Sequence, residues 1–192
     1  MLTTKPLLNS DHELLSIDRS LLIVTDIQGK LAEIMANREE LFNNVISMIE
    51  GAKILGVPIL WVEQYPEGLG PTRPEIAEHL EGLEPMAKMT FSSLRNEAIK
   101  KRFEEFDRDQ IIITGIETHI CIHQTSMDIL ASGRQAYVVA DAVSSRTSFN
   151  KLIGLNKLAK AGAIITSMET VLFELLGEAG GDKFKEILKL VK

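Results

Sequence analysis

The chain has 192 residues, of which 45% are hydrophobic and 25% charged, and its formal net charge is −6. This length and composition allow one well-filled core, so we expect a single domain over residues 1–192. Acidic and basic residues are mixed along the sequence and form no basic stripe that could neutralise phosphates, which argues against nucleic acid as a partner.

The single cysteine and the lack of long apolar runs limit where the protein can work. One cysteine excludes an internal disulfide. The first 15 residues lack the uninterrupted apolar run of a secretory signal. No apolar segment reaches the roughly 18 residues that a membrane-spanning helix needs. We therefore expect a cytoplasmic protein that does not bind membranes.

Five short runs rich in β-branched residues alternate with longer segments of helical period. The runs are 21–25, 57–63, 110–115, 136–141 and 163–167. This alternation is typical of parallel strands joined by crossover helices. The runs are apolar almost throughout, as strands covered on both faces should be. The sequence therefore predicts an α/β fold with a buried, mostly parallel sheet.

Apolar residues at helical spacing predict helices between and after these strands. The predicted helical segments are 30–55, 96–106, 119–132, 148–161 and an amphipathic tail at 181–192. We expect the tail to dock on the domain or on a partner subunit. Residues 64–95 contain four of the six prolines and are interpreted as a long active-site loop with little structure of its own.

Polar residues at the carboxyl ends of the predicted strands are the first candidates for a site, because ligands of open α/β sheets bind there. They are Asp26, Glu63, the residues after Gly115, and Asp141.

Cys121 follows the strand at 110–115 by a few residues. A free cysteine is commonly a small buried hydrophobe, and that interpretation stays open. If a helix begins near Thr118 or His119, however, the sulfur lies in its first turn, where unpaired N–H groups and the helix dipole favour a thiolate. Such a sulfur could act as a nucleophile.

Asp26 and Lys88 could supply the remaining chemistry. Asp26 could instead cap a helix or turn, and Lys88 could lie on the surface with its charge in water. A thiol needs a base, and a carboxylate serves as one if burial raises its pKa or a cation organises the pair. Asp26, Lys88 and Cys121 could meet in one pocket.

Metal and cofactor motifs are weak. His119 and His123 have the i, i+4 spacing of zinc ligands, but Ile120 stands where a metalloprotease has Glu, and no third ligand is evident. No glycine-rich phosphate-binding motif follows the first strand. The sequence predicts neither a metal nor a cofactor.

Four segments resemble, in order and over nearly the whole chain, the isochorismatase-like cysteine hydrolases. They are VTDIQGKL, KMTFSSL, GIETHICIHQTSMDIL and VVADAVSSR, and EQYPEGLGPT resembles the subgroup of isochorismatase-domain-containing proteins. The resemblance implies a three-layer αβα fold with a six-stranded, Rossmann-like sheet, including a short extra strand near 83–87. We also expect a homo-oligomer, a dimer or larger. One sheet face is too small to cover the apolar stripes of the long first helix and of the tail, and the resemblance implies such an assembly.

The resemblance also assigns roles to residues. It implies a triad of Asp26, Lys88 and Cys121, and a cis peptide bond between Ile116 and Glu117. An oxyanion hole would form from the backbone N–H groups of Glu117 and Cys121. The matching loops suggest three further residues that line the pocket: Gln28, Tyr65 and Phe91.

Two departures from the family narrow the expected reaction. No histidine-bearing segment follows the second strand, where metal-dependent nicotinamidases carry one, and Cys121 is present, whereas isochorismatases that cleave a vinyl ether lack it. We therefore predict a metal-independent cysteine hydrolase that acts on a small amide or related acyl compound through a thioester. The alternative is a scaffold or interaction protein that keeps the fold without the chemistry.

Overall fold

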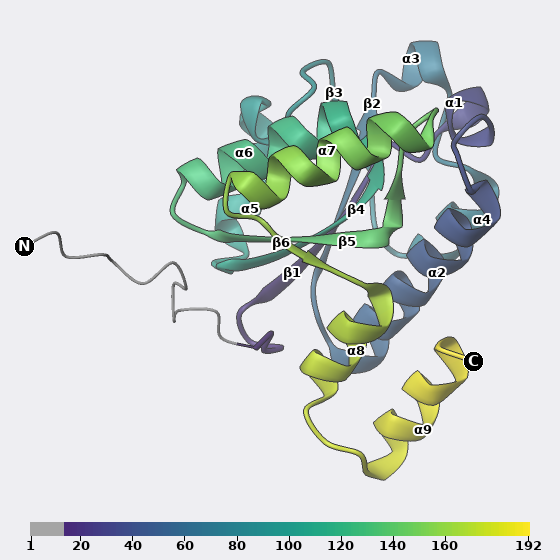
Figure 1. The fold of residues 1–192 in the computed structure, drawn as a ribbon, viewed down its shortest axis with the longest axis vertical. Coiled ribbons are helices and arrows are strands. Elements are labelled where there is room, and N and C mark those ends of the chain that lie inside the picture. The colour runs from purple at the N-terminus through teal and green to yellow at the C-terminus, as the bar shows by residue number, and fades with distance from the viewer. Residues whose placement is uncertain (1–13) are drawn as a thin grey trace, which may run out of the picture.

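A six-stranded parallel sheet forms the centre of the computed structural model, and helices cover both of its faces (Figure 1). The structure describes residues 14–192; residues 1–13, which carry most of the segment considered for a secretory signal, lie outside this range. The strands are β1 (Ser20–Thr25), β2 (Ile59–Gln64), β3 (Met86–Lys88), β4 (Gln110–Ile116), β5 (Gln135–Ser144) and β6 (Ile164–Thr166). The predicted αβα fold and six-stranded sheet are confirmed.

The two faces of the sheet bury separate hydrophobic clusters because side chains alternate along each strand. In β1, Leu22 and Val24 contribute to the cluster under one helical layer, and Leu21 and Ile23 contribute to the cluster under the other. This two-sided burial explains why the strands are apolar almost throughout.

The helices form two layers, one on each face of the sheet (Figure 1). One layer holds α2 (Arg38–Leu55), α8 (Met168–Leu176) and α9 (Gly181–Leu190). The other holds α5 (Glu97–Glu105), α6 (His123–Ala131) and α7 (Ser148–Lys160). The tail helix α9 packs on α2 and α8, with Ile187 fully buried, so its predicted docking on the domain is confirmed.

The helix predicted over 30–55 is two helices. α1 (Gly29–Glu33) ends before Ile34, and α2 begins after Asn37, whose backbone is left-handed with φ 53°. The Ala36 N–H donates to the carbonyl of Ser145 at 2.9 Å, which ties this break to the end of β5. The hydrophobic period continues across the break, so the period alone could not reveal it.

The segment 64–95 is more ordered than predicted. It contains α3 (Pro66–Leu69), α4 (Pro74–Ala77), two short 3₁₀ turns and the edge strand β3, which lies slightly later than the expected 83–87. The interpretation as a loop with little structure was wrong, since prolines here begin helices rather than exclude them. α8 had no counterpart among the predicted helices, although its apolar positions follow a helical period.

The strand order β3-β2-β1-β4-β5-β6 places a topological switch point between β1 and β4. Successive connections leave these two strands toward opposite faces, which opens a crevice beyond their carboxyl ends. Among residues 14–192, no helix is long and apolar enough to cross a membrane.

Candidate active site

Asp26 occupies the crevice at the end of β1. Its backbone is left-handed, with φ 62°, and its N–H donates to the carbonyl of Val62 at 3.0 Å. Gly115 at the end of β4 allows the two strands to approach closely, because a Cβ there would lie 2.0 Å from the carbonyl oxygen of Thr25. The switch point thus brings the ends of β1 and β4 together around the aspartate.

Lys88 forms a buried ion pair with Asp26. Its Nζ lies 2.8 Å from Asp26 Oδ2 and 2.7 Å from Oε1 of Gln64, and its side chain is fully buried. The Gln64 amide is oriented in turn by its Nε2, which donates to the carbonyl of Met89 at 3.0 Å. The surface alternative for Lys88 is therefore wrong.

Cys121 lies in the first turn after β4, in the π-helical segment Thr118–Ile122 that leads into α6. It is buried at 7% exposure. α7 packs closely on this turn at Gly154, where a Cβ would approach the backbone of Thr118 and His119 to 2.9 Å. Cys121 is therefore held firmly, and its position in a first helical turn is confirmed.

The resting state of Cys121 is a thiol. Burial, and secondly the negative charge of Asp26, raise the pKa of the thiol to about 12, against the opposing effect of Lys88. The first-turn position alone predicted a thiolate, and burial outweighs it.

Asp26 is a stronger base than an exposed aspartate. Burial raises its pKa, and the charge of Lys88 only partly offsets this. Its Oδ1 is buried and accepts no hydrogen bond from the described residues, and the carboxylate interacts with the Cys121 thiol. The carboxylate therefore has an oxygen available for the thiol proton.

Glu117 links the end of β4 to the loop after β5. The Ile116–Glu117 peptide bond is cis. The buried Glu117 carboxylate accepts hydrogen bonds from the backbone N–H of Arg146 at 3.0 Å and from its Nε at 3.2 Å. The backbone N–H of Glu117 interacts with the Cys121 sulfur and lowers its pKa, so it points toward the reacting atom.

A cavity of about 110 Å³ opens beside the sulfur. Its lining residues come from both sides of the switch point: Asp26, Leu31, Gln64, Leu69, Phe91, Ile116, Glu117, Ile120 and Cys121. Phe91, expected to line the pocket, is among them.

Gln28 and Tyr65, which were also expected to line the pocket, are not part of the cavity wall. Gln28 is fully buried, and its side-chain amide bonds with the backbone N–H and carbonyl of Gln64 and with the carbonyl of Gly70. The Tyr65 ring lies against Gly68 and is 44% exposed. Both support the neighbouring loop instead.

Two polar residues at strand ends also have structural rather than chemical roles. Glu63 accepts from the N–H and hydroxyl of Thr72, and Asp141 accepts from the N–H of Met168 at the start of α8. Gln64, which was not among the predicted site residues, faces Lys88 in place of Glu63. Alternation of side chains along β2 would have placed Glu63 and Gln64 on opposite sides, but it does not say which one faces the site.

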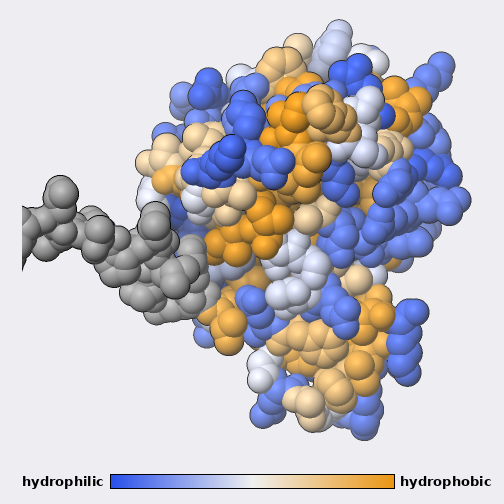
Figure 2. All heavy atoms as spheres, in the orientation of Figure 1, coloured by the Kyte–Doolittle hydropathy of each residue, from blue (hydrophilic) through white to orange (hydrophobic). Residues whose placement is uncertain are grey.

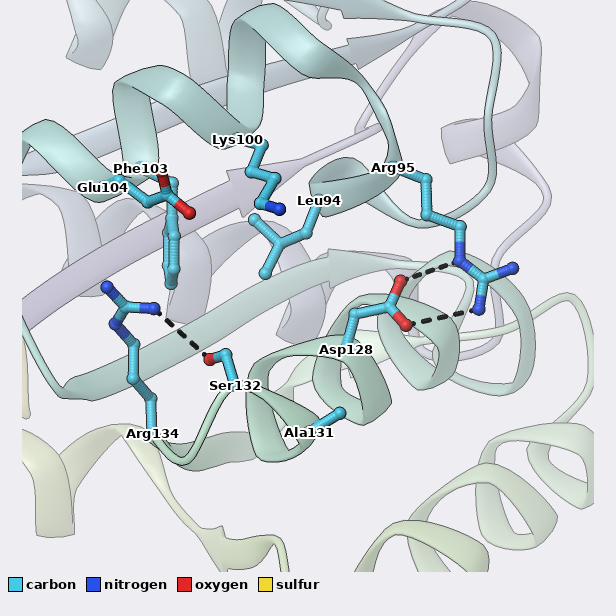
Figure 3. Close-up of a pocket in the computed structure, with 9 residues that line it drawn as sticks. All are labelled: Leu94, Arg95, Lys100, Phe103, Glu104, Asp128, Ala131, Ser132 and Arg134. Atoms are coloured by element: carbon cyan, nitrogen blue, oxygen red, sulfur yellow. Dashed lines mark hydrogen bonds and ion pairs between the residues drawn. The ribbon is translucent and has the colours of Figure 1, made fainter.

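A larger hollow of about 350 Å³ lies between α5 and α6 (Figure 3). Its charged side chains are largely paired, with Arg95 bound to Asp128 and Arg134 bound to Ser132. It holds no nucleophile beside a base, so the smaller cavity is the better candidate. No group of three or more potential metal-binding side chains occurs among residues 14–192.

Comparisons with known proteins agree with this fold. The isochorismatase domain model matches residues 20–170. Isochorismatase domain-containing protein 2 of Bos taurus is 37% identical over 90% of this chain and 83% of its own. The structure of MAR1 ribonuclease from Caenorhabditis elegans superimposes with a TM-score of 0.87 at 34% identity, covering 93% of this chain and 92% of that one. An Escherichia coli protein described as an octameric hydrolase of unknown specificity gives a TM-score of 0.88 at 21% identity, over 97% and 92% of the two chains.

Proposed function

Because the chain belongs to the isochorismatase family, whose fold and domain support a hydrolase-like function, we propose that it is a metal-independent cysteine hydrolase acting on a small amide or related acyl compound. The observation that carries the proposal is the buried contact of Asp26 with both the Lys88 ammonium, at 2.8 Å, and the Cys121 thiol. A base, a cation and a nucleophile thereby meet beside one small cavity.

The proposed reaction begins with proton transfer from the Cys121 thiol to Asp26. Because the thiol is the weaker acid, this transfer is uphill and accompanies attack of sulfur on the carbonyl carbon. The backbone N–H groups of Glu117 and Cys121 stabilise the resulting oxyanion, a contribution on the order of 3 kcal/mol per donor in acyl transfer. Lys88 keeps the carboxylate in place and balances its charge.

The second half of the reaction reverses these roles. Asp26 returns the proton to the leaving amine, the carbon–nitrogen bond breaks, and a thioester with Cys121 remains. Water then loses a proton to Asp26 and attacks the thioester carbon, the carbon–sulfur bond breaks, and Asp26 returns the proton to the sulfur. The products are a carboxylic acid and the regenerated thiol.

The test is hydrolysis of a panel of small amides, ureides and esters by the purified protein and by Cys121→Ala. The variant should fold normally and lose turnover, because alanine removes only the sulfur. Hydroxylamine should trap the acyl group released from the wild type. Retention of more than about a tenth of wild-type turnover by Cys121→Ala, equivalent to about 1.4 kcal/mol, is too much for a missing nucleophile and would contradict the mechanism.

The same experiment also tests two alternatives, a scaffold protein without activity and a ribonuclease. A well-folded wild type that turns over nothing in the panel favours the scaffold alternative. The ribonuclease named among the similar structures makes RNA a further compound to test. The net charge of −6 and the small cavity favour a small molecule over RNA.

We also propose that the protein forms a homo-oligomer, as the E. coli hydrolase of similar fold is described to do. The expected source of the interface, the stripes of the first long helix and the tail, does not support this, because α2 and α9 bury them against each other. The support comes from α7, where Phe149, Leu152 and Ile153 are 70%, 54% and 38% exposed. Figure 2 shows hydrophobic side chains gathered over this helix.

A further inference from the structure

The cavity beside Cys121 is lined by four polar and five apolar residues. Its polar side chains are those already assigned to the reaction and its support, Asp26, Gln64, Glu117 and Cys121. The rest of the wall is built from five apolar residues: Leu31, Leu69, Phe91, Ile116 and Ile120. A substrate with its carbonyl carbon at the sulfur would therefore place its acyl chain against hydrocarbon.

Two cations that contact residues of the cavity wall, Lys88 and Arg146, are already engaged. Lys88 donates to Asp26 and Gln64 with its side chain fully buried, and Arg146 binds the Glu117 carboxylate. None of the nine lining residues is itself a cation. A carboxylate on the acyl chain would lose its hydration and meet two acidic side chains without a free partner, and an ammonium would lose its hydration against the apolar wall.

The size of the cavity sets how much of an acyl chain it can enclose. A cavity of about 150 Å³ in another protein holds benzene. The volume here is about 110 Å³. An acyl chain of fewer than about six carbon atoms fits this space.

Building on the function proposed above, we propose that the substrate of this site carries a short, uncharged, apolar acyl group, and that the wall formed by Leu31, Leu69 and Ile120 is what rejects charged ones. Amides of short aliphatic acids meet this description. Amides whose acyl chain ends in a carboxylate or an ammonium group do not.

Alkylation tests the charge preference without requiring turnover, because Cys121 is the only cysteine. Rate constants for iodoacetamide, iodoacetate and 2-bromoethylamine are measured by mass spectrometry and divided by those of a small free thiol under the same conditions. Relative to the free thiol, Cys121 should favour the neutral reagent over each charged one by about ten-fold or more. Equal ratios for the protein and the free thiol would overturn the proposal.

Leu69→Lys supplies a cation to the wall and should restore labelling by iodoacetate relative to iodoacetamide. Leu69 is half-buried, so a lysine stem can lie along the wall with its charge at the rim. Leu69→Gln is the matched control, since it adds polarity and similar length without charge. If the two variants change the iodoacetate ratio equally, the wall does not select by charge and the proposal fails.

The hydrolysis panel separates this proposal from the function on which it rests. Hydrolysis that depends on Cys121 and is equally fast for butyramide and succinamic acid would retain the cysteine hydrolase and overturn the acyl-group assignment. Charge-selective alkylation without turnover of any neutral amide would contradict the hydrolase while supporting the apolar, uncharged character of the site.

Discussion

The ionisation of Asp26 and that of Cys121 depend on each other because both side chains are buried, and the charge of Lys88 acts on both. Burial raises the pKa of both acids, Asp26 raises the pKa of the thiol further, and Lys88 lowers both. The three side chains therefore favour a neutral thiol beside an ion pair. When the sulfur bonds to an electrophilic carbon, it no longer carries a full negative charge beside Asp26. The thiol therefore needs to lose its proton only when substrate is bound.

The first prediction concerns the ionisation of the thiol. The alkylation rate of Cys121 by iodoacetamide should rise with pH through the ordinary range near 9 and level only near 12. Asp26→Asn removes the carboxylate charge and should move this pKa downward, whereas Lys88→Met removes the opposing cation and should move it upward. Thiolate absorbance against pH measures all three proteins, and shifts of the same sign in both variants would contradict the assigned couplings.

The same pKa shift links pH to stability. The thiol pKa is raised in the folded state, so above about pH 9 the unfolded chain loses this proton first and stability falls as the pH approaches 12. In Cys121→Ala this component is absent. Denaturant titrations of both proteins at pH 8 and pH 10.5 should therefore give a larger loss of unfolding free energy in the wild type.

Gln64 is a positioning residue for Lys88. Its oxygen accepts a hydrogen bond from the Lys88 ammonium at 2.7 Å, and Asp26 accepts another at 2.8 Å. Gln64→Leu should lower kcat by about ten-fold, because a buried ammonium loses an acceptor at a cost of about 1 to 3 kcal/mol. The Cys121 pKa should move as well. If the Cys121 pKa is unchanged and only KM rises, Gln64 lines the cavity without positioning Lys88.

At the scale of elements, the side chain of Gln28 joins the start of α1 to the end of β2 and to α3, and we call this set of contacts the Gln28 clamp. Its buried amide makes three hydrogen bonds to the backbone of Gln64 and Gly70. Gly29 permits the start of α1 to approach the end of α3 closely, since a Cβ there would lie 2.1 Å from the carbonyl oxygen of Leu69. The apolar wall of the cavity therefore depends on contacts between segments that are 36 or more residues apart.

Gln28→Leu should destabilise the protein by about 3 kcal/mol, because three partly buried backbone groups lose their partners. It should also raise KM, since α3 and Leu69 would lose their anchor. Guanidinium denaturation and steady-state kinetics measure the two effects. Gln124→Leu, the same change at a half-buried site on α6, is the control, and an equal loss of stability in both variants would contradict the clamp.

At the scale of the whole molecule, α7 has two faces with different roles. Its Gly154 packs on the turn that carries Cys121, whereas Phe149 and Leu152 face solvent in the single chain. An exposed apolar surface of this kind is typical of a protein–protein interface. A second copy on this surface would lie directly behind the helix that holds the nucleophile in place.

Light scattering at micromolar concentration should give a mass of at least two chains. Leu152→Glu should reduce the mass toward that of one chain, because a carboxylate would be buried in the interface without a partner. Lys160→Glu places the same carboxylate at an exposed position at the far end of the same helix, with a larger change of charge, and should leave the assembly intact. A monomeric wild type, or dissociation of both variants alike, would contradict an interface on α7.

The sequence by itself determined the class of fold and the candidate chemistry. Strands covered on both faces must be apolar throughout, so composition alone revealed five of the six, and the resemblance supplied the short edge strand β3. The residues at the ends of β1 and β4 could be named in advance because parallel strands deliver their carboxyl ends to one edge. Asp26 and Cys121 follow directly from this rule.

Tertiary structure alone decided which polar side chains reach the site and how they ionise. Glu63 and Gln64 are adjacent in sequence, yet only Gln64 contacts Lys88, because orientation about β2 depends on neighbouring strands and loops. The direction of the Cys121 pKa shift depends on burial and on the distance to Asp26, neither of which a first-turn position specifies. The apolar wall likewise exists only once Gln28 has joined α1 to the loop after β2, because contacts between segments distant in sequence leave no local pattern.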